Sequence, residues 1–574
     1  MKKLAVITAF GGINSAGRSS GHQAFKRLVY DHLKPNEQLS TLNSLAQLMG
    51  LPQKKTIEAT WQTEIINGSL VRGWDNISWD ANKVDFHQPF TDENGHQCWR
   101  LEHKRLAVQS AGQLPKGFDP ANTYKSVHHP RGLQMAIYAI SDALGQLGES
   151  WDKVRKVIHP DQVSVYAGAA MAQLDSFGHG GMLQAPLLGK RGSAKQCALG
   201  LSQMSADFIN AYVLGSVGST GSATGACASF LYNLKLAIDD IQSGRARVAF
   251  VGTSEAPLFP EVVDGYNNMT ALANESNLRK LDGLNDEQQQ PDFRRASRPF
   301  AENCGFTIAE SAQFIMLTDD DLAMQLGLSI HGSVGEVFVN ADGFKKSIAN
   351  PGIGNYLTLG KAVAEAERWL GAEAVQKGSY VHAHGSSTPS NRTTESEIFS
   401  KLAKAFNINS WDITAVKSYL GHSIGSAAGD QVITTLGSWA YGVIPGITST
   451  HAIADDVHQN NLNFLLNHKE FSVKEKPLAF INAKGFGGNN ASAFLISPGK
   501  TKELIKDKYC AMQWQDYQAK NEAVQARSKE WDTQTSLGNT NPTYHFGEGV
   551  LQPEDLTLTK ESIYLKGWCK AIHL

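Results

Sequence analysis

The chain has 574 residues, more than the usual domain of about 100–200, so two or more domains or one large fused architecture are expected. Hydrophobic residues make up 41% and charged residues 19%, which is typical of a soluble globular protein and not of a disordered or coiled-coil chain. The formal net charge is −2, so the overall charge gives no support for nucleic acid or an anionic membrane as a partner.

The cysteines and the first residues bear on the cellular location. The 6 cysteines are scattered without a C-x-x-C pair, which argues against a disulfide scaffold or a cysteine-rich zinc site and favours a reducing cytoplasm. Residues 1–10 could pass for a short signal peptide, but the apolar run is short, β-branched and followed by Gly11-Gly12, so we interpret it as a buried strand. No apolar run reaches the ~18 residues of a membrane span, so we expect no integral membrane segment.

The first half of the chain alternates predicted strands and helices, which indicates α/β layering. Residues 40–103 interrupt this pattern; they are irregular and rich in tryptophan, as expected of an insertion over a core. The expected elements are, in chain order, a strand at 1–10, a helix at 23–33, a helix at 133–147, a strand at 163–168 and an apolar strand at 248–253.

A polar segment at 274–298, expected to be a loop, precedes the second half. Beyond Pro498 the composition changes to charged and glutamine-rich sequence, which indicates an appended extension. The expected elements between them are strands at 314–317 and 329–339, a helix at 359–370, and strands at 379–383, 478–481 and 491–496.

One cysteine lies in a turn of small residues, Gly221-Ser-Ala-Thr-Gly-Ala-Cys227-Ala-Ser, at the predicted start of a helix. The helix is indicated by apolar residues that recur with its period, at Phe230, Leu234, Ala237 and Ile241. Unpaired amides and the positive end of the helix dipole favour the thiolate of a cysteine in such a place, so Cys227 is a candidate nucleophile. On this stretch alone, a small buried hydrophobic residue is an equally good interpretation.

Three further motifs follow in the second half. A strand leads into His384-Gly-Ser-Ser-Thr388, Lys417 stands five residues before the glycine-flanked His422, and Gly485-Phe486-Gly487-Gly488 joins two strands. Taken singly, each has an ordinary explanation: a loop histidine, a solvated lysine or a tight hairpin. Glu395, likewise, could be a charge on a helix surface.

The conjunction and order of these motifs with Cys227 resemble the β-ketoacyl-acyl carrier protein synthases of the thiolase superfamily, over about residues 1–20 and 160–498. Two active-site histidines are typical of the elongating type of synthase. The resemblance implies an α/β thiolase-like fold, in which two similar α/β halves pack as a five-layer αβαβα sandwich. The N-terminal half would span 1–320 with the insertion at 40–103, the C-terminal half 321–498, and the C-terminal extension 499–574.

The resemblance also implies a role for each motif. Cys227 would take the acyl group from a thioester, and the backbone amides of Cys227 and Phe486 would form the oxyanion hole. His384 and His422 would stabilise the enolate that forms when malonyl-acyl carrier protein loses carbon dioxide. Lys417 would orient the two histidines, and Glu395 would support them.

The substrate-binding residues implied in the same way are Ser386, Thr388, Gly487 and Gly488, and Phe486 would gate the acyl pocket. No metal or organic cofactor is needed for this reaction. The expected partners are acyl carrier protein, the substrates acyl-CoA or acyl-acyl carrier protein and malonyl-acyl carrier protein, and a second copy of the chain in a cytoplasmic homodimer, with no nucleic acid or membrane.

The sequence departs from the family at several positions. Arg392 stands where an aspartate is usual, Ser386 where a threonine is common, and Phe230 where a glycine is usual. With the two additions to the chain, these departures suggest a long, divergent bacterial group that begins fatty acid synthesis from acetyl-CoA although it has two histidines.

Other functions remain as alternatives at this stage. A degradative thiolase would present a second catalytic cysteine near the C-terminal glycine loop, and residues 484–490 contain none. A Cys-His hydrolase would not require the second histidine with its lysine. A polyketide-type ketosynthase would share these motifs, whereas a non-enzymatic chain-length-factor-like subunit would usually lack the nucleophile.

Overall fold

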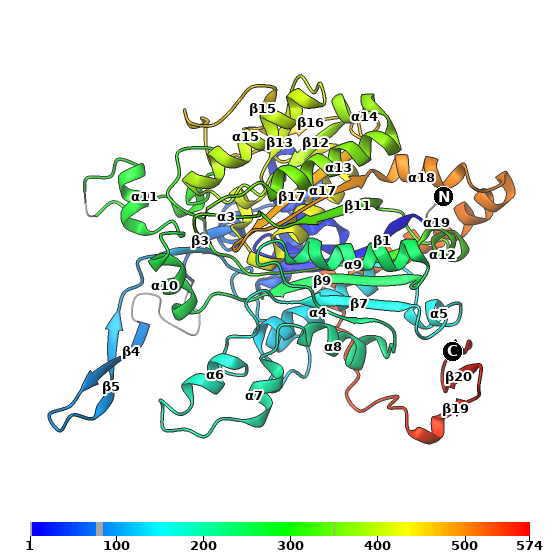
Figure 1. Ribbon diagram of the computed structural model, residues 1–574, viewed down its shortest axis with the longest axis horizontal. Coiled ribbons are helices and arrows are strands. Elements are labelled where there is room, and N and C mark those ends of the chain that lie inside the picture. Colours follow the sequence, from blue (N-terminus) through cyan, green and yellow to red (C-terminus); the bar gives the residue numbers. More distant parts are fainter. Residues whose placement is uncertain (1–2, 76–83, 287, 349) are drawn as a thin grey trace.

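A 12-stranded mixed sheet runs through the centre of the computed structural model (Figure 1). The structure describes residues 3–75, 84–286, 288–348 and 350–574. The strands in spatial order are β15 (Leu462–Phe464), β13 (Trp411–Thr414), β12 (Ser379–His382), β17 (Leu478–Gly485), β18 (Asn489–Ile496), β11 (Gly332–Asn340), β1 (Ala5–Asn14), β10 (Ser311–Asp319), β9 (Val248–Glu255), β7 (Val163–Gly168) and β8 (Thr220–Gly221), with β2 (Gly17–Arg18) beside β1.

The strand order of one half of this sheet repeats in the other. In the N-terminal half β1, β10, β9, β7 and β8 are neighbours in that order, joined by two antiparallel and then two parallel pairings. In the C-terminal half β11, β18, β17, β12 and β13 repeat the same sequence of pairings. The first strands of the halves meet antiparallel where Ala5 pairs with Val334. The repeat agrees with the two similar halves implied by the resemblance.

Helices cover the outer face of each half of the sheet, and two more helices pack between the halves. This arrangement gives five layers (Figure 1). Helices α9 (Ser229–Ser243) and α17 (Ala427–Tyr441) pack between the two halves of the sheet. Strand β9 is buried on both faces of the sheet, which explains why its sequence is a nearly continuous apolar run. The outer faces are covered by α4 (Arg131–Gln146) and α8 (Met204–Ile209) on one half and by α13 (Gly354–Leu370) and α15 (Pro389–Ala405) on the other.

The remaining elements lie around these layers. The other helices are α1 (Gln23–Leu28), α2 (Pro35–Leu48), α3 (Ala59–Asn67), α5 (Trp151–Arg155), α6 (His179–Gln184), α7 (Ala194–Leu199), α10 (Pro260–Asn268), α11 (Glu275–Leu281), α12 (Asp320–Leu326), α14 (Ala372–Gln376), α16 (Lys417–Leu420), α18 (Pro498–Lys506) and α19 (Ala511–Ser536). The small sheets pair β3 (Val71–Gly73) with β6 (Ser110–Gly112), β4 (Val84–Thr91) with β5 (Gln97–Lys104), β14 (Val443–Ile444) with β16 (Lys469–Glu470), and β19 (Leu556–Leu558) with β20 (Ser562–Leu565) and β21 (Ile572–His573).

Three expectations of local structure were wrong. The predicted insertion at 40–103 is not irregular: α2 and α3 pack around the buried Trp61, and β4 and β5 form a hairpin that projects from the body (Figure 1). Residues 76–83 of it lie outside the described part. The expected loop at 274–298 contains α11, because the side chain of Asn274 caps its first turn. The helix expected at 23–33 ends at Leu28 and continues as a short 3₁₀ turn.

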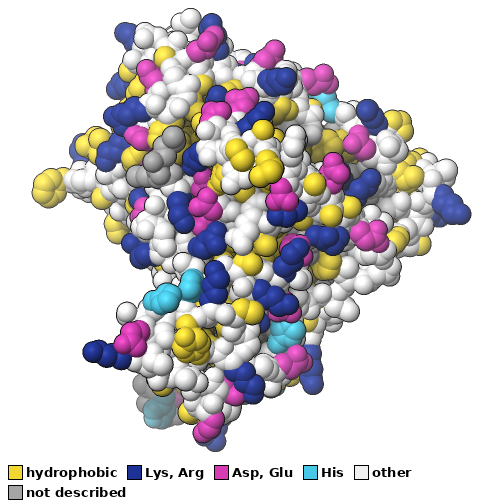
Figure 2. All heavy atoms as spheres, turned by 90° about the vertical axis from the view of Figure 1, so that its right-hand side faces the viewer, with side chains coloured by type: hydrophobic (Ala, Val, Ile, Leu, Met, Phe, Trp, Pro, Cys, Tyr) yellow, Lys and Arg dark blue, Asp and Glu magenta, His cyan; other side chains and the backbone are white. Residues whose placement is uncertain are grey.

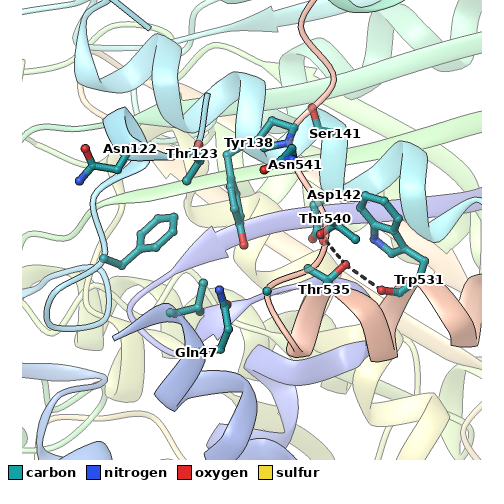
Figure 3. A pocket seen from close by; sticks show the side chains of 14 residues that line it. Gln47, Asn122, Thr123, Tyr138, Ser141, Asp142, Trp531, Thr535, Thr540 and Asn541 are labelled. Atoms are coloured by element: carbon teal, nitrogen blue, oxygen red, sulfur yellow. Dashed lines mark hydrogen bonds between the residues drawn. The ribbon is translucent and has the colours of Figure 1, made fainter. Parts of the chain in front are cut away.

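The C-terminal extension packs on the N-terminal half. The side chain of Arg18 is buried between the carboxylates of Asp142 in α4 and Asp532 in α19. Beside this ion-pair cluster, α2, the segment 118–123, α4 and the extension line an open cavity of about 210 Å³, into which Figure 3 shows the side chains of Tyr138, Thr123 and Gln47 projecting.

The surface on the side of α18 and α19 carries basic and acidic side chains interspersed over the whole face (Figure 2). This face therefore shows no large area of a single charge sign, in keeping with the net charge of −2. In the described part of the chain, no helix is both long enough and apolar enough to cross a membrane.

Replacement of Gly145 by alanine tests the packing of the extension. A Cβ at Gly145 would lie 1.9 Å from Cε2 of Trp531 in α19, so we expect Gly145→Ala to lower the free energy of unfolding by about 1–3 kcal/mol through overpacking. A Cβ at Gly265, also inside a helix, would meet nothing within 4 Å, so Gly265→Ala should stabilise the protein slightly. Thermal unfolding, together with limited proteolysis of the extension, measures both effects. Equal stabilities of the Gly145→Ala and Gly265→Ala variants would contradict the packing of α19 against α4.

Candidate active site

The turn that carries Cys227 is held by hydrogen bonds within itself. The Ser229 hydroxyl accepts from the N–H of Gly225 at 3.0 Å and donates to the carbonyl of Ala226 at 2.6 Å. Ala226 has a left-handed backbone, with φ of +49°, which turns the chain sharply just before Cys227. Helix α9 begins two residues after the cysteine, as predicted.

The glycine turn at 485–488 lies directly against this cysteine turn. A Cβ at Gly485 would lie 2.2 Å from the carbonyl oxygen of Gly225 and 3.0 Å from the nitrogen of Cys227, so only glycine permits the contact. Gly487 and Gly488 have φ of +88° and +92°, a conformation that favours glycine. Phe486, between Gly485 and Gly487, is 36% exposed, and its ring centroid lies 6.3 Å from that of Tyr266.

The electrostatics of Cys227 differ from the sequence prediction. Its side chain is buried, with 3% exposed, and burial raises the pKa of the thiol to about 12. The charge of Lys417 and the backbone N–H groups of Cys227 and Phe486 act in the opposite direction and favour the thiolate. The favourable effect predicted for the helix start is therefore present at the sulfur but is outweighed by desolvation.

His384 is held by its backbone between two groups of opposite charge. The Glu395 carboxylate accepts from the N–H of His384 at 2.7 Å, and the Lys417 ammonium donates to the carbonyl oxygen of the same residue. The N–H of Lys484 donates to Nδ1 of the His384 ring at 3.3 Å. Nδ1 is therefore an acceptor, so a neutral ring carries its proton on Nε2 and can donate from there.

Glu395 and Lys417 are both buried, not solvated surface charges as their types would suggest. Besides His384, the Glu395 carboxylate accepts from the N–H of Gly385 at 2.8 Å and from the side-chain amides of Asn391 and Asn482, each at 2.8 Å. Burial lowers the pKa of Lys417 to about 8, while the charge of Glu395 opposes that shift.

The second histidine, His422, faces the first. Its N–H donates to the carbonyl of Thr307 at 2.6 Å, and its carbonyl accepts from the N–H of Ala309 at 3.0 Å. The ring centroids of His384 and His422 are 5.2 Å apart and the rings are nearly perpendicular. Burial, and then the charge of Lys417, hold the pKa of each imidazole well below 6.5, so both rings are neutral at pH 7.

The remaining predicted residues lie close by. The hydroxyls of Ser386 and Thr388 are 3.1 Å apart on the loop that follows His384. Arg392, by contrast, does not support the histidine pair: it forms ion pairs with Glu302 and Asp456 and donates to the carbonyl of Ala301. The structure thus brings all ten predicted site residues to one region and gives Arg392 a separate structural contact.

Sequence reasoning missed two buried carboxyl groups at the site. Glu255, at the end of β9, accepts from the N–H of Ala170, and burial raises its pKa to about 8. Asp430 lies in the otherwise apolar first turn of α17 and accepts from the hydroxyl of Ser423, next to His422. The available signal was a charged residue in an apolar run: Glu255 follows the strand at 248–253, and Asp430 interrupts a run of small and apolar residues.

Among the described residues, no cluster of histidine, cysteine, aspartate and glutamate side chains could hold a metal ion. The six cysteines are all free. The groups gathered at this site are a buried thiol, two neutral imidazoles, the buried Lys417 ammonium and backbone amides.

Two family models match the chain: the β-ketoacyl synthase N-terminal domain over residues 49–323 and the C-terminal domain over residues 331–451. The sequence is 42% identical to the β-ketoacyl-[acyl-carrier-protein] synthase FabY of Pseudomonas aeruginosa, over 100% of this chain and 98% of that protein.

Solved structures agree with these matches. The crystal structure of the ketosynthase FabY from P. aeruginosa superposes with a TM-score of 0.96 at 41% identity, over 100% of this chain and 98% of that one, which confirms the predicted thiolase-like fold. A type II polyketide ketosynthase in complex with its acyl-carrier protein gives a TM-score of 0.60 at 17% identity, over 87% of this chain and 100% of that one, and supports the fold alone. The sequence matches and the common fold establish that the chain belongs to the β-ketoacyl synthase family.

Proposed function

We propose that the protein is a β-ketoacyl-acyl carrier protein synthase of fatty acid biosynthesis, which condenses a Cys227-bound acyl group with malonyl-acyl carrier protein and releases carbon dioxide. The observation that carries this proposal is the meeting of a buried cysteine, two neutral imidazoles and a buried lysine at one site. The resemblance of the whole chain to a synthase of this kind supports it.

In the first step, the sulfur of Cys227 attacks the carbonyl carbon of an acyl thioester. The new S–C bond replaces the bond to the carrier thiol, which leaves with the proton of Cys227. The backbone N–H groups of Cys227 and Phe486 favour negative charge on the sulfur, and we propose that they also stabilise the oxyanion of the tetrahedral intermediate. The nearby Lys417 charge favours the thiolate that attacks.

In the second step, malonyl-acyl carrier protein loses carbon dioxide and its thioester carbonyl becomes an enolate. Neutral imidazole N–H groups of His384 and His422 donate hydrogen bonds to that oxygen without the cost of placing two cations side by side. The enolate carbon then attacks the thioester carbonyl on Cys227, the C–S bond breaks, and the β-ketoacyl group remains on the carrier protein. The sulfur of Cys227 leaves as a thiolate and takes up a proton from water. Lys417 and Glu395 keep His384 in place through its backbone during this step.

Ser386 and Thr388, on the loop after His384, are proposed to bind the amides of the carrier's pantetheine arm, with Gly487 and Gly488 beside them and Phe486 as the gate of the acyl pocket. We further infer a cytoplasmic homodimer. Strand β8 supports this inference because it is an edge of the central sheet and can pair with a second copy.

We infer that the acyl donor is short, with acetyl-CoA as the primer. The Phe230 ring, one helical turn after Cys227, is fully buried and lies against Gly429, where an added Cβ would come within 2.9 Å of the ring. We propose that a bulky side chain so close in the chain to the nucleophile limits the room for the acyl chain. Resemblance to FabY over the whole chain supports the same subgroup.

Replacement of the nucleophile tests the proposed function most directly. We expect the wild-type protein to gain one acetyl group on incubation with acetyl-CoA, and Cys227→Ala to gain none and to form no β-ketoacyl product, because the proposed acyl-carrying thiol is removed. Intact-mass analysis and product formation from malonyl-acyl carrier protein measure the two effects. Full condensation by Cys227→Ala would refute the mechanism, and Cys197→Ala, which removes an exposed thiol, is the control.

Truncation of either histidine should separate the two steps. In His384→Ala and in His422→Ala, we expect acylation of Cys227 to continue while condensation falls by about 10²–10³-fold, since one donor to the enolate oxygen is lost. Single-turnover formation of the β-ketoacyl product from pre-acylated enzyme measures the second step alone. Normal condensation by either variant would show that its imidazole does not stabilise the enolate.

Enlargement of the space under Cys227 should alter donor length. We expect Phe230→Ala to raise acylation by longer acyl donors relative to acetyl-CoA, and to lower the free energy of unfolding by about 3–5 kcal/mol because a core aromatic ring is removed. Leu234→Ala, one turn further along the same buried face, should destabilise the core without changing the donor preference. Competition between acetyl and longer donors, read by intact mass, compares the variants; an unchanged preference in Phe230→Ala would contradict the pocket assignment.

A further inference from the structure

Asp430 is a buried carboxylate in a helix that is otherwise made of uncharged residues. Only 3% of Asp430 is exposed, and among the described residues no lysine or arginine forms an ion pair with it. Oδ1 accepts hydrogen bonds from the side chains of Asn14, Ser311 and Gln313 at 2.9–3.0 Å. An unpaired buried carboxylate is costly, so a carboxylate kept here with a full set of donors calls for a specific role.

The fourth hydrogen bond of Asp430 reaches the active site. The hydroxyl of Ser423, the residue after His422, donates to Oδ2 of Asp430 at 2.6 Å. Three of the donors to Asp430 come from strands of the N-terminal half, whereas Ser423 and Asp430 itself belong to the C-terminal half. The carboxylate thus connects the His422 loop to the rigid strands β1 and β10.

The loop that carries His422 has a strained backbone. Ile424 has φ of +47°, which is rare for a β-branched residue, and Gly421 before the histidine has φ of +77°. Such a conformation persists only where the surroundings hold it in place. Next to the histidine, the Ser423–Asp430 hydrogen bond anchors this turn to the core together with the backbone contacts of His422 with Thr307 and Ala309. Further along the turn, the hydroxyl of Thr253 donates to the carbonyl of Gly425, and that of Ser426 donates to the carbonyl of Ser311.

The imidazole of His422 has no such anchor of its own. For His384, the N–H of Lys484 binds Nδ1 and fixes the ring, but Nδ1 of His422 is buried and has no hydrogen-bond partner among the described residues. The direction of the His422 ring therefore depends on the backbone that carries it and on packing against Phe306, whose ring centroid lies 5.1 Å away.

We propose that Asp430 is a positioning residue of the condensation step, which holds the strained His422 loop through the hydroxyl of Ser423 and so directs the His422 imidazole at the enolate oxygen. The inference rests on the proposed function and deepens it. It concerns only the second step, because Cys227 and its turn have separate contacts.

The test is Ser423→Ala, with Ser426→Ala as the matched control. Both serines are buried and each hydroxyl donates one hydrogen bond, but that of Ser426 goes to the carbonyl of Ser311 and not to Asp430. For each full-length variant, acylation of Cys227 by acetyl-CoA is followed by intact mass, and single-turnover condensation of the acylated enzyme with malonyl-acyl carrier protein is followed by product formation.

We expect Ser423→Ala to acylate like the wild type but to condense about 10–100-fold more slowly, as is usual when a reacting group is misplaced by about 1 Å. Ser426→Ala should keep both rates although its thermal stability falls as well. Unchanged acylation shows that a slow variant is folded. Normal condensation by Ser423→Ala, or an equal loss in both variants, overturns the proposal while the proposed function stands; if the wild type does not condense at all, both fail.

Discussion

The backbone of His384 lies between two buried charges, and the arrangement of the site depends on these contacts. The Glu395 carboxylate binds its N–H, and the Lys417 ammonium binds its carbonyl oxygen. Each charge would be costly to bury alone, because removal from water costs several kcal/mol per ion, but each stabilises the other. Since Glu395 comes from α15 and Lys417 from α16, the pair also fixes two helices to the end of β12.

Burial determines the charge state of the reacting groups as well. Desolvation raises the pKa of Cys227 and lowers the pKa values of His384 and His422, so the site without substrate contains a thiol and two neutral rings. Lys417 remains the nearby cation that favours negative charge on the sulfur. In a site of low polarity, the hydrogen bonds of imidazoles and backbone amides to a developing oxyanion are stronger than in water.

The site is built at the meeting of the two halves of the molecule. Cys227 belongs to the half that contains β9 and β10, whereas the two histidines and the glycine turn belong to the other half. Close backbone contact at Gly485 and the hydrogen bonds around Asp430 join these halves at the site. Displacement of one half relative to the other would therefore separate the nucleophile from the groups that stabilise the enolate.

The sequence by itself predicted the α/β class and the motif loops, because residue types at short spacing carry these signals. The two similar halves and the role of Cys227 as nucleophile were implied by the family resemblance of the motifs taken together. Its interpretation of 40–103 as irregular was wrong, and its interpretation of 274–298 as a loop missed α11, since the small core around Trp61 and the cap of α11 depend on contacts that composition does not reveal. Only the tertiary structure decided that Glu395 and Lys417 are buried and that Arg392 forms an ion pair with Asp456. It also decided that Asp430 accepts a hydrogen bond from Ser423, the residue after His422. The physical reason is that burial and charge state depend on residues far apart in the chain, which only the packed halves bring together.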